Sequence, residues 1–260
     1  MSGDSSKPAV KAASKPLWNP VTAILVVIVI VLLMPIVLQT TMLFVPQIFG
    51  VTGKEAAHWL SSSTFANFLY VVCIEAISVG VLAWFLKRRK APFWTSLGLR
   101  RPKWSDAGYT LIGVVAYFAL FAIMLSVIQL MTDIDTTKEQ ALGFDRGISG
   151  LNLVLAFCSL VILPPFAEEL TFRGFLYGTL RRYNVSIIVP VLVTSLLFGF
   201  FHLFGGADGS LLWIAAIDTF TLSLILCVLR EKTGGIWACI ALHMLKNCFV
   251  FVNLFIISAR

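Results

Sequence analysis

Residues 161–176 read VILPPFAEELTFRGFL, a stretch that places three charges in an otherwise almost wholly apolar run. Glu168 and Glu169 are adjacent, and Arg173 follows four residues after the second glutamate. A charge at the centre of a bilayer costs roughly 2.5–3.5 kcal/mol on insertion scales. If the chain lies in a membrane, these charged side chains are therefore expected either to pair with other groups of the protein or to serve its function.

The composition is that of a polytopic membrane protein. Of the 260 residues, 58% are hydrophobic and 13% are charged, and the mean hydropathy is +0.91. The apolar runs are continuous rather than alternating, which disfavours a β-barrel. With about 20 residues per span, the length allows six to eight spans. The predicted fold is all-α, a polytopic transmembrane helix bundle of about seven spans.

The sequence predicts one short tail followed by one domain. Residues 1–19 are polar and are predicted to form a disordered cytoplasmic tail. Residues 20–260 are predicted to form a single transmembrane domain, with a catalytic core at about 151–257. The expected spans are about 21–45, 64–86, 107–131, 151–166, 186–204, 211–229 and 235–257.

The basic residues predict the orientation. The connection that begins KRRK at Lys87 carries seven Lys and Arg residues, so it is expected on the cytoplasmic side. With that loop inside, 15 of the 20 basic residues lie inside, which predicts a cytoplasmic N-terminus and an outside C-terminus. The same clustering beside apolar spans accounts for the net charge of +7, so nucleic acid is not an expected partner.

Two prolines make the fourth span unusual. Pro164 and Pro165 each lack a backbone N–H and are expected to break the helix. A single straight helix over 151–183 would be about 50 Å long, against a hydrocarbon core of about 30 Å. The sequence therefore predicts a helix that is broken by proline, strongly tilted or partly on the membrane surface, and that carries the two glutamates.

The spacing of the charges assigns them different partners. Glu169 and Arg173 lie at i,i+4 on one helix face, which favours a structural ion pair. Glu168 is rotated by about 100° from that face and is left without the arginine. If the next hairpin turns near Val185, Glu168 and His202 lie at the same depth, because each is 17 residues from the turn. A carboxylate beside an imidazole suits acid–base chemistry.

The last span supplies a second polar pair. His243 and Asn247 are again at i,i+4 in the stretch HMLKN and share one helix face. Such a pair can join helices in a membrane or donate hydrogen bonds to a developing anion. Glu75 and Asp218 are further intramembrane carboxylates whose roles stay open.

Three motifs in this order resemble a known family. The stretch EELTFR at 168–173 fits EExxxR, FGFFH at 198–202 fits FxxxH, and HMLKN at 243–247 fits HxxxN. The chain therefore resembles the CPBP family, the CAAX-processing type II prenyl endopeptidases and bacteriocin-processing (Abi) intramembrane proteases. The resemblance covers about 155–253 and the SLGLR loop, and no motif position departs from the pattern.

The resemblance implies a glutamate-dependent intramembrane endopeptidase. It implies that Glu168 activates the hydrolytic water with His202, and that His243 and Asn247 stabilise the oxyanion. Three further residues of the motifs are implied to be supporting: Glu169, Arg173 and Phe198. We expect no cofactor or metal, although two histidines and a glutamate leave a zinc-dependent version as an alternative.

The expected partners are the lipid bilayer and a membrane-associated peptide or protein substrate, which the family would allow to be of CAAX type. The expected location is an integral, multi-pass protein of a bacterial cell membrane. A non-enzymatic scaffold or immunity protein is a rival hypothesis. A transporter is less favoured, because only one broken helix is expected rather than a pair in two similar halves. The sequence does not fix the oligomeric state.

Overall fold

The computed structural model describes residues 17–135, 138, 140–183, 186–206 and 209–258. In these ranges the chain forms helices and no strand, apart from one isolated bridge between Gln140 and Gly206. The prediction of an all-α polytopic bundle is confirmed. Most of the predicted tail, residues 1–16, lies outside the described residues.

Six helices in the described residues are long and apolar enough to cross a membrane, and a shorter apolar helix brings the bundle to about seven spans. Each long span is one continuous helix, even where part of it is π-helical. The long spans are Pro20–Ile48 (α1 Pro20–Ile28, η1 Val29–Leu33 and α2 Met34–Ile48), α4 Thr64–Arg88, α6 Trp104–Met131, Leu151–Arg181, α11 Trp213–Thr233 and Trp237–Ile257 (α12 Trp237–Val252 and η4 Asn253–Ile257). The shorter helix is α10, Ile188–Phe201.

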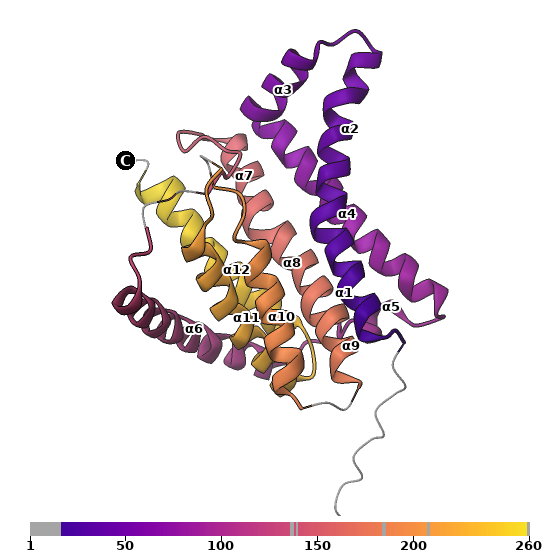
Figure 1. Ribbon diagram of the computed structural model, residues 1–260, viewed down its shortest axis with the longest axis vertical. Coiled ribbons are helices and arrows are strands. Elements are labelled where there is room, and N and C mark those ends of the chain that lie inside the picture. The colour runs from indigo at the N-terminus through magenta and orange to yellow at the C-terminus, as the bar shows by residue number, and fades with distance from the viewer. Residues whose placement is uncertain (1–16, 136–137, 139, 184–185, 207–208, 259–260) are drawn as a thin grey trace, which may run out of the picture.

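Two short helices lie outside the spans. Helix α3, Gly53–Ser62, follows the first span and begins with a capping box between Thr52 and Glu55. Helix α5, Phe93–Ser96, lies in the basic connection between α4 and α6. In Figure 1 the start of α1 and the end of the last span, drawn in yellow, lie at opposite ends of the bundle.

The prediction that Pro164 and Pro165 break the fourth span is wrong. The helix runs on from Leu151 to Arg181 without interruption. It is built from α7 Leu151–Phe157, η2 Cys158–Ile162, α8 Leu163–Glu169, η3 Leu170–Tyr177 and α9 Gly178–Arg181, where η2 and η3 are π-helical. This helix of 31 residues is about 46 Å long, so it must tilt or project from a hydrocarbon core of about 30 Å.

A side chain from another helix explains why the helix continues. In α-helical hydrogen bonding the Leu160 carbonyl would accept from residue 164, and in π-helical bonding from residue 165, but both are prolines. The Asn247 side chain of α12 donates its Nδ2–H to this carbonyl at 2.9 Å. The orphaned acceptor is thus satisfied from a neighbouring helix, as membrane helices with internal proline require.

The basic connection packs against the central helix, here the name for residues 151–181. A Cβ on Gly174 would lie 2.9 Å from the Leu97 carbonyl oxygen, so only glycine lets the two backbones approach this closely. Trp18 was predicted in the disordered tail. It is instead buried, and its ring lies 5.2 Å from that of Phe175, because the start of α1 docks on the same helix.

The continuity of the central helix depends on Asn247, and a double-mutant cycle tests this. We expect Asn247→Ala to lower the free energy of unfolding by about 0.6 kcal/mol, and by no more than about 1.7. In a Pro164→Ala background the cost should fall, because residue 164 regains an N–H that can pair with the Leu160 carbonyl. The measurement is denaturant unfolding in mixed micelles.

Asn253→Ala is the matched control, since Asn253 lies further along the same C-terminal helix and is exposed. Its cost should be the same in both backgrounds. Equal costs of Asn247→Ala with and without Pro164 would contradict the role given to this hydrogen bond.

Candidate active site

The EExxxR segment places its second glutamate and its arginine in the protein interior. The Arg173 Nη1 atom lies 2.9 Å from the Glu169 Oε1 atom, and both side chains are fully buried. The Arg173 guanidinium also lies over the Phe198 ring, 4.6 Å from its centroid. The ion pair expected from the i,i+4 spacing is therefore present, and a cation–π contact ties it to α10.

The ring of Phe198 contacts side chains of all three motifs. Phe198 is fully buried, and its ring centroid lies 4.7 Å from that of His202 and 5.8 Å from that of His243. Helix α10 can approach α11 closely because residue 199 is glycine, where a Cβ would lie 2.9 Å from the Ala216 carbonyl oxygen. This close packing fixes the end of α10, from which His202 projects.

His243 is held between the two glutamates. Its Nδ1 atom lies 2.9 Å from the Glu169 Oε1 atom, and its Nε2 atom lies 3.8 Å from the Glu168 Oε2 atom. An ionised carboxylate only accepts, so the Nδ1 nitrogen donates to Glu169. The Nε2 distance is too long for a direct hydrogen bond, which leaves this nitrogen facing Glu168 across a gap.

One ring nitrogen of His202 forms a hydrogen bond to its own helix, and the other does not. Its Nδ1 atom lies 2.8 Å from the Phe198 carbonyl oxygen. A carbonyl only accepts, so Nδ1 carries the hydrogen, and in the neutral ring Nε2 is left with a lone pair. The ring is therefore oriented by its own helix and keeps a proton acceptor available.

Unlike its neighbour Glu169, Glu168 has no hydrogen-bonding partner among the described residues. Its side chain is 28% exposed and makes no hydrogen bond to any residue that the structure describes. Glu168 and His202 both line two cavities, of about 250 and 280 Å³. The structure thus brings these two residues to a common wall, as the spacing around residue 185 predicts.

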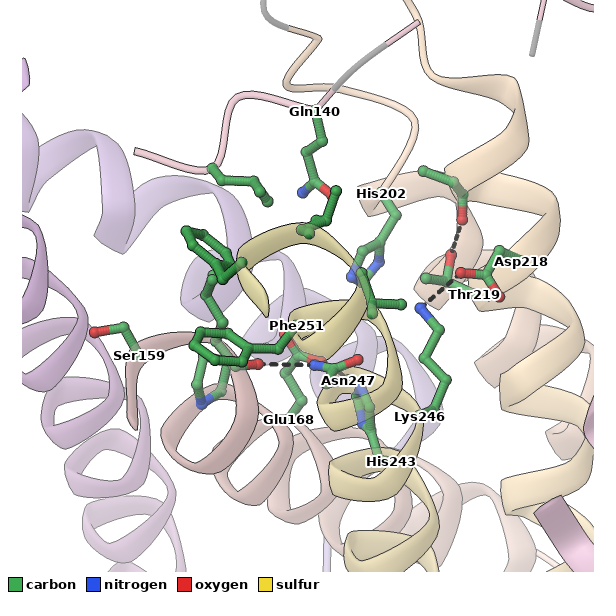
Figure 2. Close-up of a pocket in the computed structure, with 17 residues that line it drawn as sticks. Gln140, Ser159, Glu168, His202, Asp218, Thr219, His243, Lys246, Asn247 and Phe251 are labelled. Atoms are coloured by element: carbon green, nitrogen blue, oxygen red, sulfur yellow. Dashed lines mark hydrogen bonds and ion pairs between the residues drawn. The ribbon is translucent and has the colours of Figure 1, made fainter. Parts of the chain in front are cut away.

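The cavity of about 250 Å³, here named the polar cavity, is lined by all four residues predicted to be catalytic. It lies between the central helix, α11 and the last span, and Figure 2 shows its side chains. Its polar lining consists of Gln140, Ser159, Glu168, His202, Asp218, Thr219, His243, Lys246 and Asn247. Glu169, Arg173 and Phe198 do not line it and contact it only through His202 and His243.

Asp218 joins this cavity through a charge pair that the sequence did not predict. The Lys246 Nζ atom lies 2.6 Å from the Asp218 Oδ2 atom, and the Tyr117 hydroxyl donates to Asp218. The pair neutralises two intramembrane charges and joins α6, α11 and α12. Its signal in the sequence was one basic and one acidic residue within spans, but their distance along the chain hid the pairing.

The second cavity, here named the apolar cavity, lies between the first span, α4 and the central helix. Most of its lining is apolar side chains such as Ile30, Ile74 and Phe172. Glu75 of α4 also lines it, beside Glu168 and His202. The structure therefore places each carboxylate of open role in a cavity that Glu168 also lines, Asp218 in the polar cavity and Glu75 in the apolar cavity.

Metal-binding side chains are not grouped in the parts of the chain that the structure describes. No three His, Cys, Asp or Glu residues there lie close enough together to hold a metal ion. The zinc alternative would need Glu168, His202 and His243 as its ligands. In this arrangement the Nδ1 atoms of both histidines are occupied by protein acceptors, and only their Nε2 atoms remain.

A protein-family model matches the C-terminal part of the chain. Residues 150–249 match the family model described as type II CAAX prenyl endopeptidase Rce1-like. This match confirms the resemblance drawn from the three motifs, and it contains the whole of EExxxR, FxxxH and HxxxN. The first three spans lie outside it.

Two curated relatives are themselves uncharacterised. The chain is 30% identical over 139 residues to the uncharacterized protein YyaK of Bacillus subtilis, covering 53% of this chain and 45% of the relative. It is 34% identical over 94 residues to an uncharacterized 24.3 kDa protein of Escherichia coli, covering 36% of this chain and 41% of the relative. The chain thus spans less than half the length of these relatives. No solved structure matches the chain.

The buried ion pair should be essential for stability. We expect Arg173→Met to lower the free energy of unfolding by about 3–5 kcal/mol, because it removes the arginine charge that is paired with the buried Glu169 carboxylate and leaves that carboxylate only the hydrogen bond from His243. The double variant Glu169→Gln/Arg173→Met should regain a large part of that loss, since neither charge remains. The measurement is denaturant unfolding in detergent micelles, with Lys54→Met on exposed α3 as a control that leaves stability unchanged. A single variant as stable as the wild type would contradict this account.

Proposed function

Residues 150–249 match the family model described as type II CAAX prenyl endopeptidase Rce1-like, and on that premise we propose that this chain is an intramembrane endopeptidase. It would hydrolyse a peptide bond of a membrane-associated protein or peptide. The observation that carries the proposal is Glu168, a carboxylate with no hydrogen bond among the described residues that lines a cavity inside the bundle together with His202.

The first step is activation of water. A water molecule between Glu168 and His202 gives a proton to the Glu168 carboxylate, while the unprotonated His202 Nε2 atom orients it by accepting its second hydrogen. The Nδ1–H bond to the Phe198 carbonyl supports this role, because it keeps the lone pair of His202 on the cavity side. The water oxygen then attacks the carbonyl carbon of the scissile bond.

The second step needs donors for the oxyanion of the tetrahedral intermediate. His243 donates its Nδ1–H to Glu169, which fixes the ring with its Nε2 atom toward the cavity, where an Nε2–H group can donate to the oxyanion. Asn247 has two amide hydrogens. One is used by the Leu160 carbonyl, which fixes the side chain and leaves the second hydrogen for the intermediate.

The third step is departure of the amine. The proton held on Glu168 passes to the leaving nitrogen as the carbon–nitrogen bond breaks, which restores the carboxylate and produces a new carboxyl terminus. Every proton is accounted for by Glu168 and water. The proposed reaction therefore needs no metal, and the Glu169–Arg173 pair supports it only by holding His243 and Phe198.

The cavities support a substrate that approaches from the membrane. The apolar cavity can take an apolar side chain or lipid group, and the polar cavity can take peptide backbone. We propose a membrane-associated substrate, with prenylated CAAX tails as one class to test. The orientation proposed from the basic loops has the N-terminus in the cytoplasm and the C-terminus outside, in a bacterial cell membrane.

The test compares cells that express the wild type with cells that express Glu168→Gln. Mass spectrometry of new peptide termini in the membrane fraction should find termini that depend on the wild-type protein. The variant should form them at least about 100-fold more slowly, because it cannot accept a proton. Glu55→Gln is the matched control, since glutamine at this exposed position of α3 preserves the capping box and activity should stay at the wild-type level.

Two outcomes would redirect the proposal. Identical termini in wild-type and Glu168→Gln cells, both at normal protein levels, would favour the non-enzymatic scaffold. Activity of the purified protein that is lost on exhaustive chelation and restored by zinc would favour the zinc-dependent mechanism.

A further inference from the structure

Glu75 is an intramembrane carboxyl group with no partner in the part of the chain that the structure describes. It lies near the middle of α4, a span of 25 residues, and no ion pair or hydrogen bond of its side chain occurs among the described residues. Polar groups in a membrane span are costly, and those without partners are candidates for function. Helix α4 lies outside the family match, so neither the motifs nor the relatives assign this residue a role.

Among the residues that the structure describes, those that line the cavity around Glu75 include no Lys or Arg. The first span contributes only apolar side chains to the apolar cavity, and α4 itself contributes Tyr70 and Ser78 as its other polar groups. The central helix contributes Glu168 and Thr171, and His202 lies at the end of α10. The Nδ1–H of His202 is donated to the Phe198 carbonyl, so it does not serve Glu75.

Electrostatics then decide which of the two carboxyl groups is ionised. Two carboxylates that share a cavity of low dielectric repel each other, and the one without an ion-pair partner keeps a proton. The Glu168 Oε2 atom lies 3.8 Å from the His243 Nε2 atom, whereas no Lys, Arg or His of the described residues forms an ion pair with Glu75. Glu75 is therefore the neutral partner, with an O–H group directed at a mostly apolar space.

A neutral carboxyl in such a cavity has a use in substrate binding. A peptide segment that is unwound for cleavage exposes backbone carbonyls that no water satisfies inside a membrane. Apolar sites fix the orientation of a ligand with a few placed polar groups. We propose that Glu75 is a substrate-anchoring residue of the Glu168 site, which donates its O–H to a backbone carbonyl of the bound chain. This inference rests on the proposed protease function.

The test uses Glu75→Gln and Glu75→Leu in purified protein reconstituted in lipid vesicles, with a substrate found by comparison of termini. Glu75→Leu should raise KM roughly 3- to 10-fold at neutral pH with little change in kcat, since one hydrogen bond of substrate binding is lost. Glu75→Gln keeps an N–H donor of similar size, so its KM should stay near the wild-type value. Ala76→Leu, which adds bulk at an exposed position of α4, should behave as the wild type.

The pH dependence separates this role from a structural one. As pH rises, Glu75 of the wild type loses the proton that it donates, so KM should rise. Glu75→Gln has no such proton, and its KM should stay constant over the same range. An unchanged KM in Glu75→Leu, or a Glu75→Gln variant as impaired as Glu75→Leu at neutral pH, would overturn the inference.

One measurement does not depend on hydrolysis. A protonated carboxyl has its own carbonyl stretching band in the infrared spectrum, and that band should be present in the wild type at neutral pH and missing from Glu75→Gln. Its absence from the wild type would overturn the neutral state of Glu75. A wild type that cleaves nothing would overturn the proposed function and the anchoring role together, whereas the infrared band would still decide the protonation state.

Discussion

The fully buried ion pair between Glu169 and Arg173 is the interaction on which the site depends. Two charges without access to water must satisfy each other, and here each also holds a third group. Arg173 lies over the Phe198 ring of α10, and Glu169 accepts from His243 of α12. One pair within a single helix thereby fixes the position of two other spans, each of which carries a motif residue of the proposed protease.

Adjacent carboxyl groups have opposite environments because the helix rotates by about 100° between them. Glu169 is enclosed, and its Oε1 atom is paired with both Arg173 and His243, while Glu168 lines two cavities and makes no hydrogen bond to a described residue. Neighbouring carboxyl groups with such different surroundings are suited to different roles. We assign Glu169 to orientation of His243 and Glu168 to proton transfer with water.

Much of this arrangement could be predicted from sequence, because it depends on local spacing. The spans follow from apolar runs, the Glu169–Arg173 pair from its i,i+4 separation, and the common cavity of Glu168 and His202 from equal distances to a turn. These features involve residues close along one helix or across one hairpin. Their geometry is therefore fixed by helical periodicity before any tertiary contact is known.

Features that depend on distant side chains could not be predicted. Proline is expected to end a helix, but the Asn247 amide donates to the Leu160 carbonyl that Pro164 leaves without a donor, 87 residues earlier in the chain. Lys246 and Asp218 likewise pair across two helices, and Trp18 packs on a helix that lies far along the chain. Each outcome depends on which helices are neighbours, and that information is absent from local patterns.

The most direct test of the central claim is a single turnover in water labelled with oxygen-18. If Glu168 activates water as a base, the label should appear in the new carboxyl terminus of the product and not in the Glu168 side chain. Label in the Glu168 carboxyl would show that the glutamate attacks the substrate itself and would contradict the account.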